Sequence, residues 1–405
     1  MTASLDLAAI RSHFPSLASG TAHFDGPGGT QTPDVVARAV HDTLVAPLSN
    51  RGVLTEAERN ADVAVTEARA ALGDLLAADP SGIVFGRSMT QLTMELARTL
   101  AKRWGPGDEV VVTRLDHDAN VRSWVLAAQR VGATVRFADF DPATGELDPA
   151  EIARHLSPST RLVAVTAASN LIGTMPDVRA IADLVHAAGA QLFVDGVHYC
   201  AHAVVDVAAL GADYLACSPY KFLGPHCGAV FGRPELLAEL EPDKLLPSPD
   251  RVPERFELGT LPYELLAGTT AAVDFLASMV PSSATTRRER LVASMTALEA
   301  HEERLRDRIE RGVLGLPGVT VHSRAARRTP TLLVTFAGHD PRAVQAFLAE
   351  QRINAPAGSF YAHEAAGHLG LGESGGLRIG LAPYVDDADA DRLLGALEQL
   401  VTTRR

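Results

Sequence analysis

The sequence predicts an α/β protein: a parallel or mostly parallel sheet with helices on both faces, followed by a smaller α+β domain. Three observations predict this fold. Short apolar stretches alternate with helical stretches from about residue 60 to residue 235. Near residue 285 a long, highly charged helical pattern begins. After it the order becomes strand, helix, strand, helix. The first alternation is typical of parallel strands joined by helical crossovers.

Each predicted strand of the large sheet is rich in β-branched residues. Each is bounded by glycine, aspartate or asparagine, which favour turns. The six stretches are EVVVT (109–113), TVRFADF (134–140), RLVAVTAAS (161–169), QLFVDG (191–196), DYLACS (213–218) and GAVFG (228–232).

The segments between the strands carry helical periodicity. VRSWVLAAQRVG and DVRAIADLVHAAG each end in glycine, the usual residue just past a helix end. The charged helix at 285–312 would connect two domains. We therefore predict an N-terminal segment at 1–20 that packs with the small domain, a large domain at 21–284, and the linking helix with the small domain at 285–405.

Composition and charge narrow the class of protein. The 405 residues are 46% hydrophobic and 21% charged, as in ordinary globular proteins. The net charge of −12 disfavours a nucleic-acid partner, because nucleic-acid binders are usually basic. No apolar run is long enough to span a bilayer, and the N-terminus shows no signal-peptide pattern. We therefore expect no membrane association and a cytoplasmic location.

The cysteines do not predict a disulfide framework or a metal site. There are three, Cys200, Cys217 and Cys227, and none forms a C-x-x-C pair. An odd count without that spacing disfavours both disulfides and zinc. We expect free, mostly buried thiols.

Lysine is scarce in this chain. Only Lys102, Lys221 and Lys244 occur among the 37 basic residues. Arginine cannot lose its proton in a protein, so it cannot form a Schiff base as lysine does. Lys102 has the sequence context of a helix C-terminal cation and Lys244 that of a surface residue. Lys221, between apolar residues and a Gly-Pro turn, does not have the context of a solvated lysine.

Polar residues follow four of the predicted strands. His117 follows the first, Asn170 the third, Asp195 the fourth and Lys221 the fifth. In open α/β sheets, ligands bind beyond the carboxyl ends of the strands. Each residue alone has a simpler explanation, because aspartate and asparagine form turns and histidine is common in solvated loops. Their shared placement predicts a binding site.

Pyridoxal 5′-phosphate (PLP) needs such a set of groups. Its aldehyde forms a Schiff base with a lysine, and its pyridine nitrogen needs a carboxylate. A planar side chain can stack on the ring, and a helix N-terminus can bind the phosphate. The stretch FGRSMTQLTMELARTL supplies that terminus, with Ser88 and Thr90 before a helix expected to start near Gln91.

Longer motifs carry a family resemblance. VDGVHYCAH (194–202) followed by CSPYKFLGPHCG (217–228) resembles the class V aminotransferases, the fold type I PLP enzymes that include cysteine desulfurases and selenocysteine lyases. The resemblance covers nearly the whole chain and is strongest to the branch called cysteine desulfurase-like. It implies a mostly parallel sheet of the seven-stranded type. The other matching stretches are FDGPGGTQTP, LDHDANVRSW, AASNLIGTMPDV, ELGTLPYELLAG and LRIGLAPYVDDADADRLL.

The resemblance implies a role for each residue around the cofactor ring. Lys221 matches the Schiff-base lysine, and Asp195 matches the carboxylate on the pyridine nitrogen. His117 matches the stacking residue. His198 matches the residue that hydrogen-bonds the ring oxygen. Asn170 matches the asparagine near that oxygen and the substrate.

At the phosphate, Thr90 and the Met89 amide match the family's binding turn, and Ser218 matches its binding serine. Tyr220 stands where desulfurases usually carry histidine. Thr260 matches a phosphate ligand from the neighbouring subunit, which implies a homodimer.

Besides Asn170, further residues are expected near the substrate. Arg378 matches the arginine that binds the substrate carboxylate. Gly28, in DGPGGT, could bring backbone close to the substrate, although a plain turn explains it equally well. Arg51 matches a basic residue near the dimer-facing site, and a surface arginine is an equal alternative. Tyr361 stands nearest to the desulfurase nucleophile.

That nucleophile is a cysteine on a mobile loop, and the matching stretch here, NAPAGSFYAHEAAGHLG (354–370), has none. A phenol cannot accept sulfane sulfur as a thiolate does. We therefore expect Tyr361 to act as a contact or proton donor, and we do not expect desulfurase chemistry.

The resemblance implies that an amino acid forms an external aldimine and that Lys221 removes its Cα proton. β-Elimination of the C–S lyase type is favoured, transamination is second and epimerisation third. Two other classes remain open. One is a non-catalytic PLP-binding protein. The other is a nucleotide-binding protein with DGPGGT as its loop, although the glycine spacing does not match a dinucleotide fingerprint.

Overall fold

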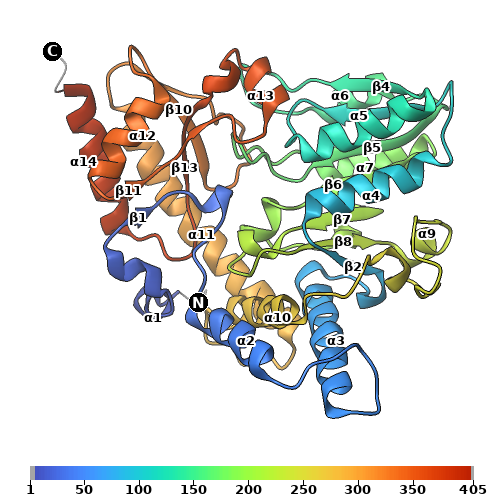
Figure 1. The fold of residues 1–405 in the computed structure, drawn as a ribbon. Coiled ribbons are helices and arrows are strands. Elements are labelled where there is room, and N and C mark those ends of the chain that lie inside the picture. Colours follow the sequence, from blue (N-terminus) through green and yellow to red (C-terminus); the bar gives the residue numbers. More distant parts are fainter. Residues whose placement is uncertain (1–4, 403–405) are drawn as a thin grey trace.

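The computed structural model describes residues 5–402 and divides into a large sheet domain and a smaller one (Figure 1). The large sheet has seven strands in the order β2-β8-β7-β6-β5-β3-β4. Strand β8 runs antiparallel to both of its neighbours, and all the other pairs are parallel. The predicted fold class is therefore confirmed. The strands are β2 (Ile83–Gly86), β3 (Glu109–Thr113), β4 (Thr134–Ala138), β5 (Thr160–Thr166), β6 (Gln191–Asp195), β7 (Tyr214–Cys217) and β8 (Gly228–Gly232).

The sequence located six of these strands and missed β2. β2 is four residues long. It pairs with β8 at the edge of the sheet. Its position matters because α4, which follows it, begins at the same edge as the site.

The strands are buried on both faces. Val110 and Val112 of β3 pack in one apolar cluster with α4 and α5, whereas Val111 between them packs in the other. This period of two is the side-chain alternation of a strand. The helices of the large domain are α2 (Asp34–Val45), α3 (Glu56–Leu76), α4 (Met89–Ala101), α5 (Ala119–Val131), α6 (Pro149–His155), α7 (Val178–Ala187), α8 (Val207–Leu210), α9 (Pro234–Ala238) and α10 (Tyr263–Ala277).

The linking helix α11 (Arg287–Leu314) leads into an antiparallel sheet in the order β12-β13-β10-β9. The predicted strand, helix, strand, helix order corresponds to β10, α12, β13 and α14, and the sequence missed the short strands. The elements are β9 (Val319–Val321), β10 (Thr331–Phe336), α12 (Pro341–Glu350), β11 (Ile353–Asn354), β12 (Ala357–Gly358), α13 (His363–His368), β13 (Gly376–Gly380) and α14 (Asp387–Thr402).

The N-terminal segment contacts the small domain. Strand β1 (Ala22–His23) pairs in parallel with β11. Before it, α1 (Leu7–Ser12) places Arg11 Nη1 2.8 Å from Asp389 Oδ2. The domain boundaries at residues 20 and 284 stay predictions.

A seam of hydrogen bonds joins the two domains beside the edge where β5 ends. The Met175 amide donates to Arg327 O, and the Thr329 amide donates to Gly173 O, each at 2.9 Å. These bonds hold the segment after β5 against the segment that leads into β10. The large and the small domain are therefore fixed relative to each other beside the site.

Among residues 5–402, no helix combines the length and apolarity needed to cross a bilayer. The cytoplasmic location stays a prediction from sequence.

A buried ion pair connects α3 to the segment before the Leu258–Thr260 loop. Arg69 donates from both terminal nitrogens to Glu257, at 2.9 and 2.8 Å, and the Phe85 amide donates to the same carboxylate at 2.9 Å. Both side chains are less than a tenth exposed.

We predict that Glu257→Gln lowers the free energy of unfolding by about 3 kcal/mol, because it removes the nearest counterion of the buried Arg69 charge and leaves only Glu254, whose Oε1 lies 3.9 Å from Arg69 Nη2. Urea unfolding measures this. Glu235→Gln, which breaks the exposed pair with Arg233, is the matched control and should change stability by less than about 0.5 kcal/mol. Equal effects of the two variants would contradict the prediction.

Candidate active site

The structure brings the predicted polar residues to one edge of the large sheet. His117 follows β3, Asn170 follows β5, Asp195 ends β6, and Lys221 follows β7. These strands are parallel, so their carboxyl ends meet at this edge. Burial has the largest effect on the pKa values of His117 and Asp195, and Lys221 is close enough for its charge to act on both as well.

The Lys221 amine lies against a backbone carbonyl and an aromatic ring. Its Nζ donates to Pro27 O at 2.5 Å and lies 4.9 Å from the centre of the Tyr220 ring. Burial lowers its pKa to about 7; the charge of Arg378 acts in the same direction and that of Asp195 opposes it. A large share of the amine is therefore neutral at pH 7, as a nucleophile or base must be.

The DGPGGT stretch lies against this lysine. Gly26 to Gly28 form a 3₁₀ turn that carries Pro27. A Cβ on Gly26 would lie 2.3 Å from Leu381 O, and one on Gly28 would lie 3.2 Å from Arg378 Nη2. Glycine is thus required for close approach to the strand that carries Arg378. The preceding strand, β1, lies outside the large sheet, so the loop is not placed as a nucleotide-binding loop would be.

Asp195 is a buried carboxylate with free hydrogen-bonding capacity. Its Oδ1 accepts from the Val197 amide at 2.9 Å, and within residues 5–402 its side chain has no second hydrogen bond. Burial raises its pKa to about 6, opposed by that bond and by Lys221. A cationic donor at the free oxygen would stabilise the charged form.

Sequence reasoning missed a second buried carboxyl, Asp116. It accepts from the Thr113 hydroxyl and, at 2.6 Å, from Asn120 Nδ2. Burial raises its pKa to about 8, and the charge of Asp195 adds to the effect. Asn120 donates from Nδ2 to this carboxyl, and its Oδ1 accepts from the indole nitrogen of Trp124 at 2.9 Å. Together they hold the turn that carries His117.

The predicted phosphate end lies where β8 meets α4. Helix α4 begins at Met89 with Ser88 as its N-cap, so the expected start near Gln91 was two residues too late and Thr90 lies inside the first turn. A Cβ on Gly228 would lie 2.2 Å from Met89 N, so only glycine allows this approach. Ser218 Oγ is buried without a partner in the described chain.

Tyr220 packs between the two loops of the site. Its ring stacks on His226 at 4.8 Å and 11°, and a Cβ on Gly29 would lie 3.2 Å from its Cδ2. Its backbone carbonyl accepts from the Thr30 amide at 3.1 Å. These contacts fix the orientation of the segment that carries Lys221.

His117 is neutral and oriented. Its Nδ1 accepts from the Ala119 amide at 3.0 Å, and its ring lies 5.6 Å from that of Tyr361, tilted by 32°. Burial lowers the pKa of His117 to about 4, and Lys221 contributes in the same direction. The ring therefore has the state suited to stacking rather than to ion pairing.

The loop that carries Tyr361 has two consecutive left-handed residues, Phe360 (φ 54°) and Tyr361 (φ 59°). Such φ values are strained for bulky residues and persist only where the surroundings enforce them. Here the Phe360 carbonyl accepts from Asn170 Nδ2 at 2.9 Å, and the Tyr361 carbonyl accepts from the Asp118 amide at 2.7 Å. The Tyr361 side chain remains 76% exposed.

Arg378 presents one free edge of its guanidinium. Nη1 donates to Asn170 O at 3.0 Å, and the Phe360 ring centre lies 3.6 Å from the guanidinium carbon. Nε is buried without a partner, and across the described chain Nη2 makes no hydrogen bond. Burial lowers the pKa of Arg378 to about 9. The Nε–Nη2 edge has the geometry that binds a carboxylate through two hydrogen bonds.

Two predicted site residues lie apart from this group. Arg51 pairs with Asp62 at 2.8 Å and with Glu254 at 3.2 Å. Thr260 lies in an exposed loop. Both were expected to act near the dimer-facing side, and within one chain neither contacts Lys221.

The three cysteines are buried and free. Burial raises the pKa of Cys227 to about 12, and the Cys217 thiol together with burial raises that of Cys200 well above its usual value. None therefore has the environment of a reactive thiolate.

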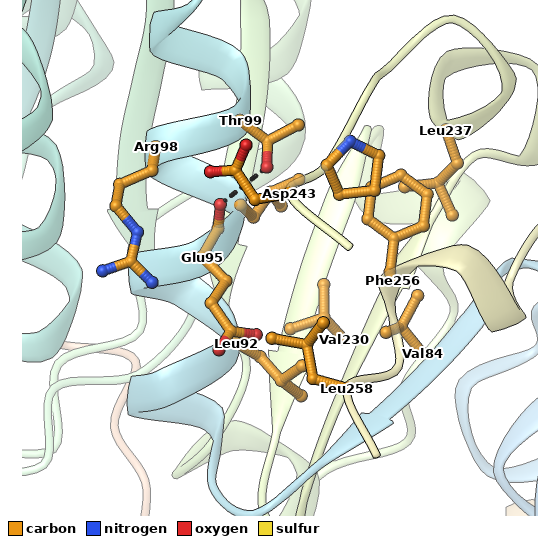
Figure 2. Close-up of a pocket in the computed structure, with 12 residues that line it drawn as sticks. Val84, Leu92, Glu95, Arg98, Thr99, Val230, Leu237, Asp243, Phe256 and Leu258 are labelled. Carbon is orange, nitrogen blue, oxygen red and sulfur yellow. Dashed lines mark hydrogen bonds between the residues drawn. The ribbon is translucent and has the colours of Figure 1, made fainter. Parts of the chain in front are cut away.

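A small, mainly apolar pocket of about 70 Å³ lies away from these groups, between α4 and the β2–β8 edge (Figure 2). Leu258 lines it and is half exposed. The other lining residues are Val84, Leu92, Glu95, Leu96, Arg98, Thr99, Val230, Leu237, Pro242, Asp243 and Phe256.

The fold and the site define a fold type I PLP enzyme. The chain belongs to the aminotransferase class V family, whose model matches residues 22–393. Members of this family use PLP, act on amino-acid substrates and are typically dimeric.

The chain is similar to individual proteins and solved structures over nearly its whole length. The uncharacterized protein MT3887 of Mycobacterium tuberculosis is 36% identical over 98% of this chain and 99% of its own length. The crystal structure of the cysteine desulfurase CsdA from Escherichia coli is 26% identical and covers 97% of this chain and 98% of its own, with a TM-score of 0.85. A C-DES mutant with glycine covalently linked to its PLP cofactor is 23% identical, covering 96% of this chain and 98% of its own, with a TM-score of 0.79.

The lowered pKa of Lys221 leads to a prediction for the cofactor-free protein. The neutral amine is the reactive form. The rate at which Lys221 is modified should therefore reach half its maximum near pH 7 and decrease at lower pH. An ordinary exposed lysine reaches that point near pH 10.4. Peptide mapping after trinitrobenzenesulfonate treatment measures this rate.

The Lys102→Arg/Lys244→Arg variant leaves Lys221 as the sole lysine and is the background for this measurement. Lys221→Ala in that background is the control and should remove the signal from this peptide. A midpoint above pH 9 would contradict the structure of the site.

Proposed function

We propose that this protein is a PLP-dependent β-eliminating enzyme of the C–S lyase type that acts on an amino acid. The observation that carries the proposal is the buried Lys221 amine with its lowered pKa, flanked by Asp195 and Arg378. A neutral amine beside a carboxylate and a carboxylate-binding arginine suits both cofactor attachment and proton removal.

Unpartnered polar groups support cofactor binding. Met89, Thr90 and Ser218 would bind the phosphate, with the free amides of the α4 N-terminus. Asp195 would bind the pyridine nitrogen through its free oxygen, and His117 would stack on the ring.

Asn170 Oδ1 is buried without a partner in residues 5–402 and faces the same site. It would act with His198 at the ring oxygen. Tyr220 would border the phosphate. The bound cofactor supplies the electron sink that acidifies the substrate Cα.

The chain's own groups account for substrate handling. The free edge of Arg378 would hold the carboxylate, and Gly28 leaves room beside it. The Lys221 amine would then take the Cα proton, since it is the basic group nearest the cofactor it anchors. Tyr361, exposed beside His117, would contact the departing Cβ substituent and supply its proton.

Desulfurase chemistry is not supported by the cysteine positions. A desulfurase needs an accessible thiolate on the loop over its site, and here that loop presents Tyr361. Sulfur leaving Cβ would therefore be released instead of being kept on the protein. Transamination is the second candidate, because Lys221 could return the proton to the cofactor carbon. Epimerisation ranks third, since His117 on the opposite ring face has a pKa of about 4 and is a weak base.

The test is incubation of the holoenzyme with single amino acids and thioether conjugates of cysteine. We expect pyruvate and a thiol or sulfide without any keto-acid acceptor, and no product from Lys221→Ala. Product formed only with an acceptor would establish transamination. Loss of optical rotation alone would establish epimerisation. A coloured protein that fails to exchange the Cα proton of any amino acid in deuterated water would contradict an enzymatic role.

A homodimer with a shared site is part of the proposal. Large aliphatic side chains are exposed in two segments that flank Arg51 and Thr260, which is unusual for a surface that faces only water. Thr260 would reach the cofactor phosphate of the neighbouring subunit, and Arg51 would lie near that subunit's site. The exposed residues are Leu44, Val45, Val53, Leu54, Leu245, Leu246 and Leu258.

Subunit mixing tests this arrangement. Thr260→Arg and Lys221→Ala should each be inactive alone. Remixed after mild dissociation, they should recover about a quarter of wild-type activity, because each mixed dimer has one intact site. Thr285→Arg, a change in an exposed loop elsewhere, should keep full activity as the matched control. Recovery of no activity in verified mixed dimers would place Thr260 in its own subunit's site.

A further inference from the structure

A chain of buried polar side chains runs from the proposed ring-oxygen site into the linking helix. His198 Nε2 lies 2.9 Å from both Thr329 Oγ1 and Thr331 Oγ1, at the start of β10. Edge to face with His198, at 4.8 Å and 74°, lies the ring of His202. His202 Nδ1 in turn lies 2.8 Å from Glu302 Oε2 on α11.

These side chains are almost completely removed from solvent. His198 is 3% exposed, His202 5% and Glu302 1%. The second oxygen of Glu302, Oε1, is buried and has no partner within the described residues. Burying the Glu302 carboxyl costs free energy of folding, because burial penalises its charged form.

Charged groups are found on both sides of this chain. On the site side, Lys221 and Arg378 face His198 and, with burial and His202, lower its pKa well below the usual value. On the far side, a small cleft beside Glu302 is lined by Glu299, Glu303, Arg306 and Arg328 among others. The His202–Glu302 pair therefore separates the site from a charged surface cleft.

We propose that His202 and Glu302 are positioning residues, which fix the ring of His198 and through it the ring-oxygen side of the cofactor. The threonine hydroxyls hold only one nitrogen of His198, which leaves rotation about that contact. The face of His202, itself held by Glu302, blocks this rotation. This inference rests on the proposed cofactor site and adds two residues that lie behind it.

The geometry has a physical consequence for binding. If the His198 ring is already held in one orientation, it loses little entropy when the cofactor binds, so its hydrogen bond contributes more to the affinity. In metal sites, removing the residues that orient a ligating histidine typically changes affinity or activity by about 10- to 100-fold, and we take the lower end of that range for His198. Loss of the pair should therefore weaken cofactor binding without removing it.

The test compares three variants. His202→Leu/Glu302→Leu removes the ring that faces His198 and replaces both polar partners by apolar groups, which leaves no unpaired buried charge. Glu302→Gln keeps the shape and removes the charge. His186→Phe is the control, because it removes another short histidine–carboxylate pair, with Asp213 at 2.9 Å, at the opposite end of the sheet.

Titrating each cofactor-free protein with PLP and following the visible absorbance gives its dissociation constant. We expect the double variant to bind about 10-fold more weakly. We also expect kcat to fall by a similar factor with KM changed less than about threefold, and the pH midpoint of the visible band to shift. Glu302→Gln should lie between it and wild type, and His186→Phe should match wild type.

Two outcomes would overturn the proposal. One is a double variant that folds and binds PLP like wild type and the control. The other is a weakening that only follows a lowered unfolding midpoint. If the double variant fails to fold, Glu302→Gln decides: an unchanged dissociation constant and pH midpoint would overturn the proposal. A colourless wild type would instead contradict the proposed function itself.

Discussion

The site depends on keeping an amine neutral at the edge of a buried sheet. The Lys221 amine is largely removed from solvent and lies near one cation, Arg378, and one anion, Asp195. Burial and the guanidinium together outweigh the carboxylate, so the proton is held weakly. Glycines allow backbone to line this site. The glycine turn brings the Pro27 carbonyl to Lys221, and Gly228 lets β8 approach the first residue of α4 at the predicted phosphate end.

The second constraint is the seam between the domains. Arg378 belongs to the small domain but bonds the carbonyl of Asn170 in the large one. Asn170 also holds the Phe360 carbonyl through its amide. One residue thus fixes both the carboxylate-binding arginine and the strained loop above it. His198 is held across the same seam by Thr329 and Thr331, so ring and substrate contacts are set by the packing of two domains.

Much of the site could be predicted because it lies where strands end. The alternation of strands and helices located six strands, and the residues after them met at one edge as parallel strands require. Asp116 was missed because an aspartate beside a histidine has no special pattern; only its burial beside Asp195 gives it meaning. The start of α4 was placed late because a serine cap and a first helical turn have similar composition. His202 and Glu302 are 100 residues apart, so no local pattern connects them.

The sequence by itself determined the fold class, the lysine, the strand-end residues and the family. The scarcity of lysine, the hydrophobic periodicity and the order of the motifs are all visible along the chain without its folded structure. Only the tertiary structure decided which nitrogen edge of Arg378 is free, which carboxyl is buried, and how the 360–361 backbone is strained. Those properties come from desolvation and from contacts between segments far apart in sequence, and both exist only once the two domains have packed together.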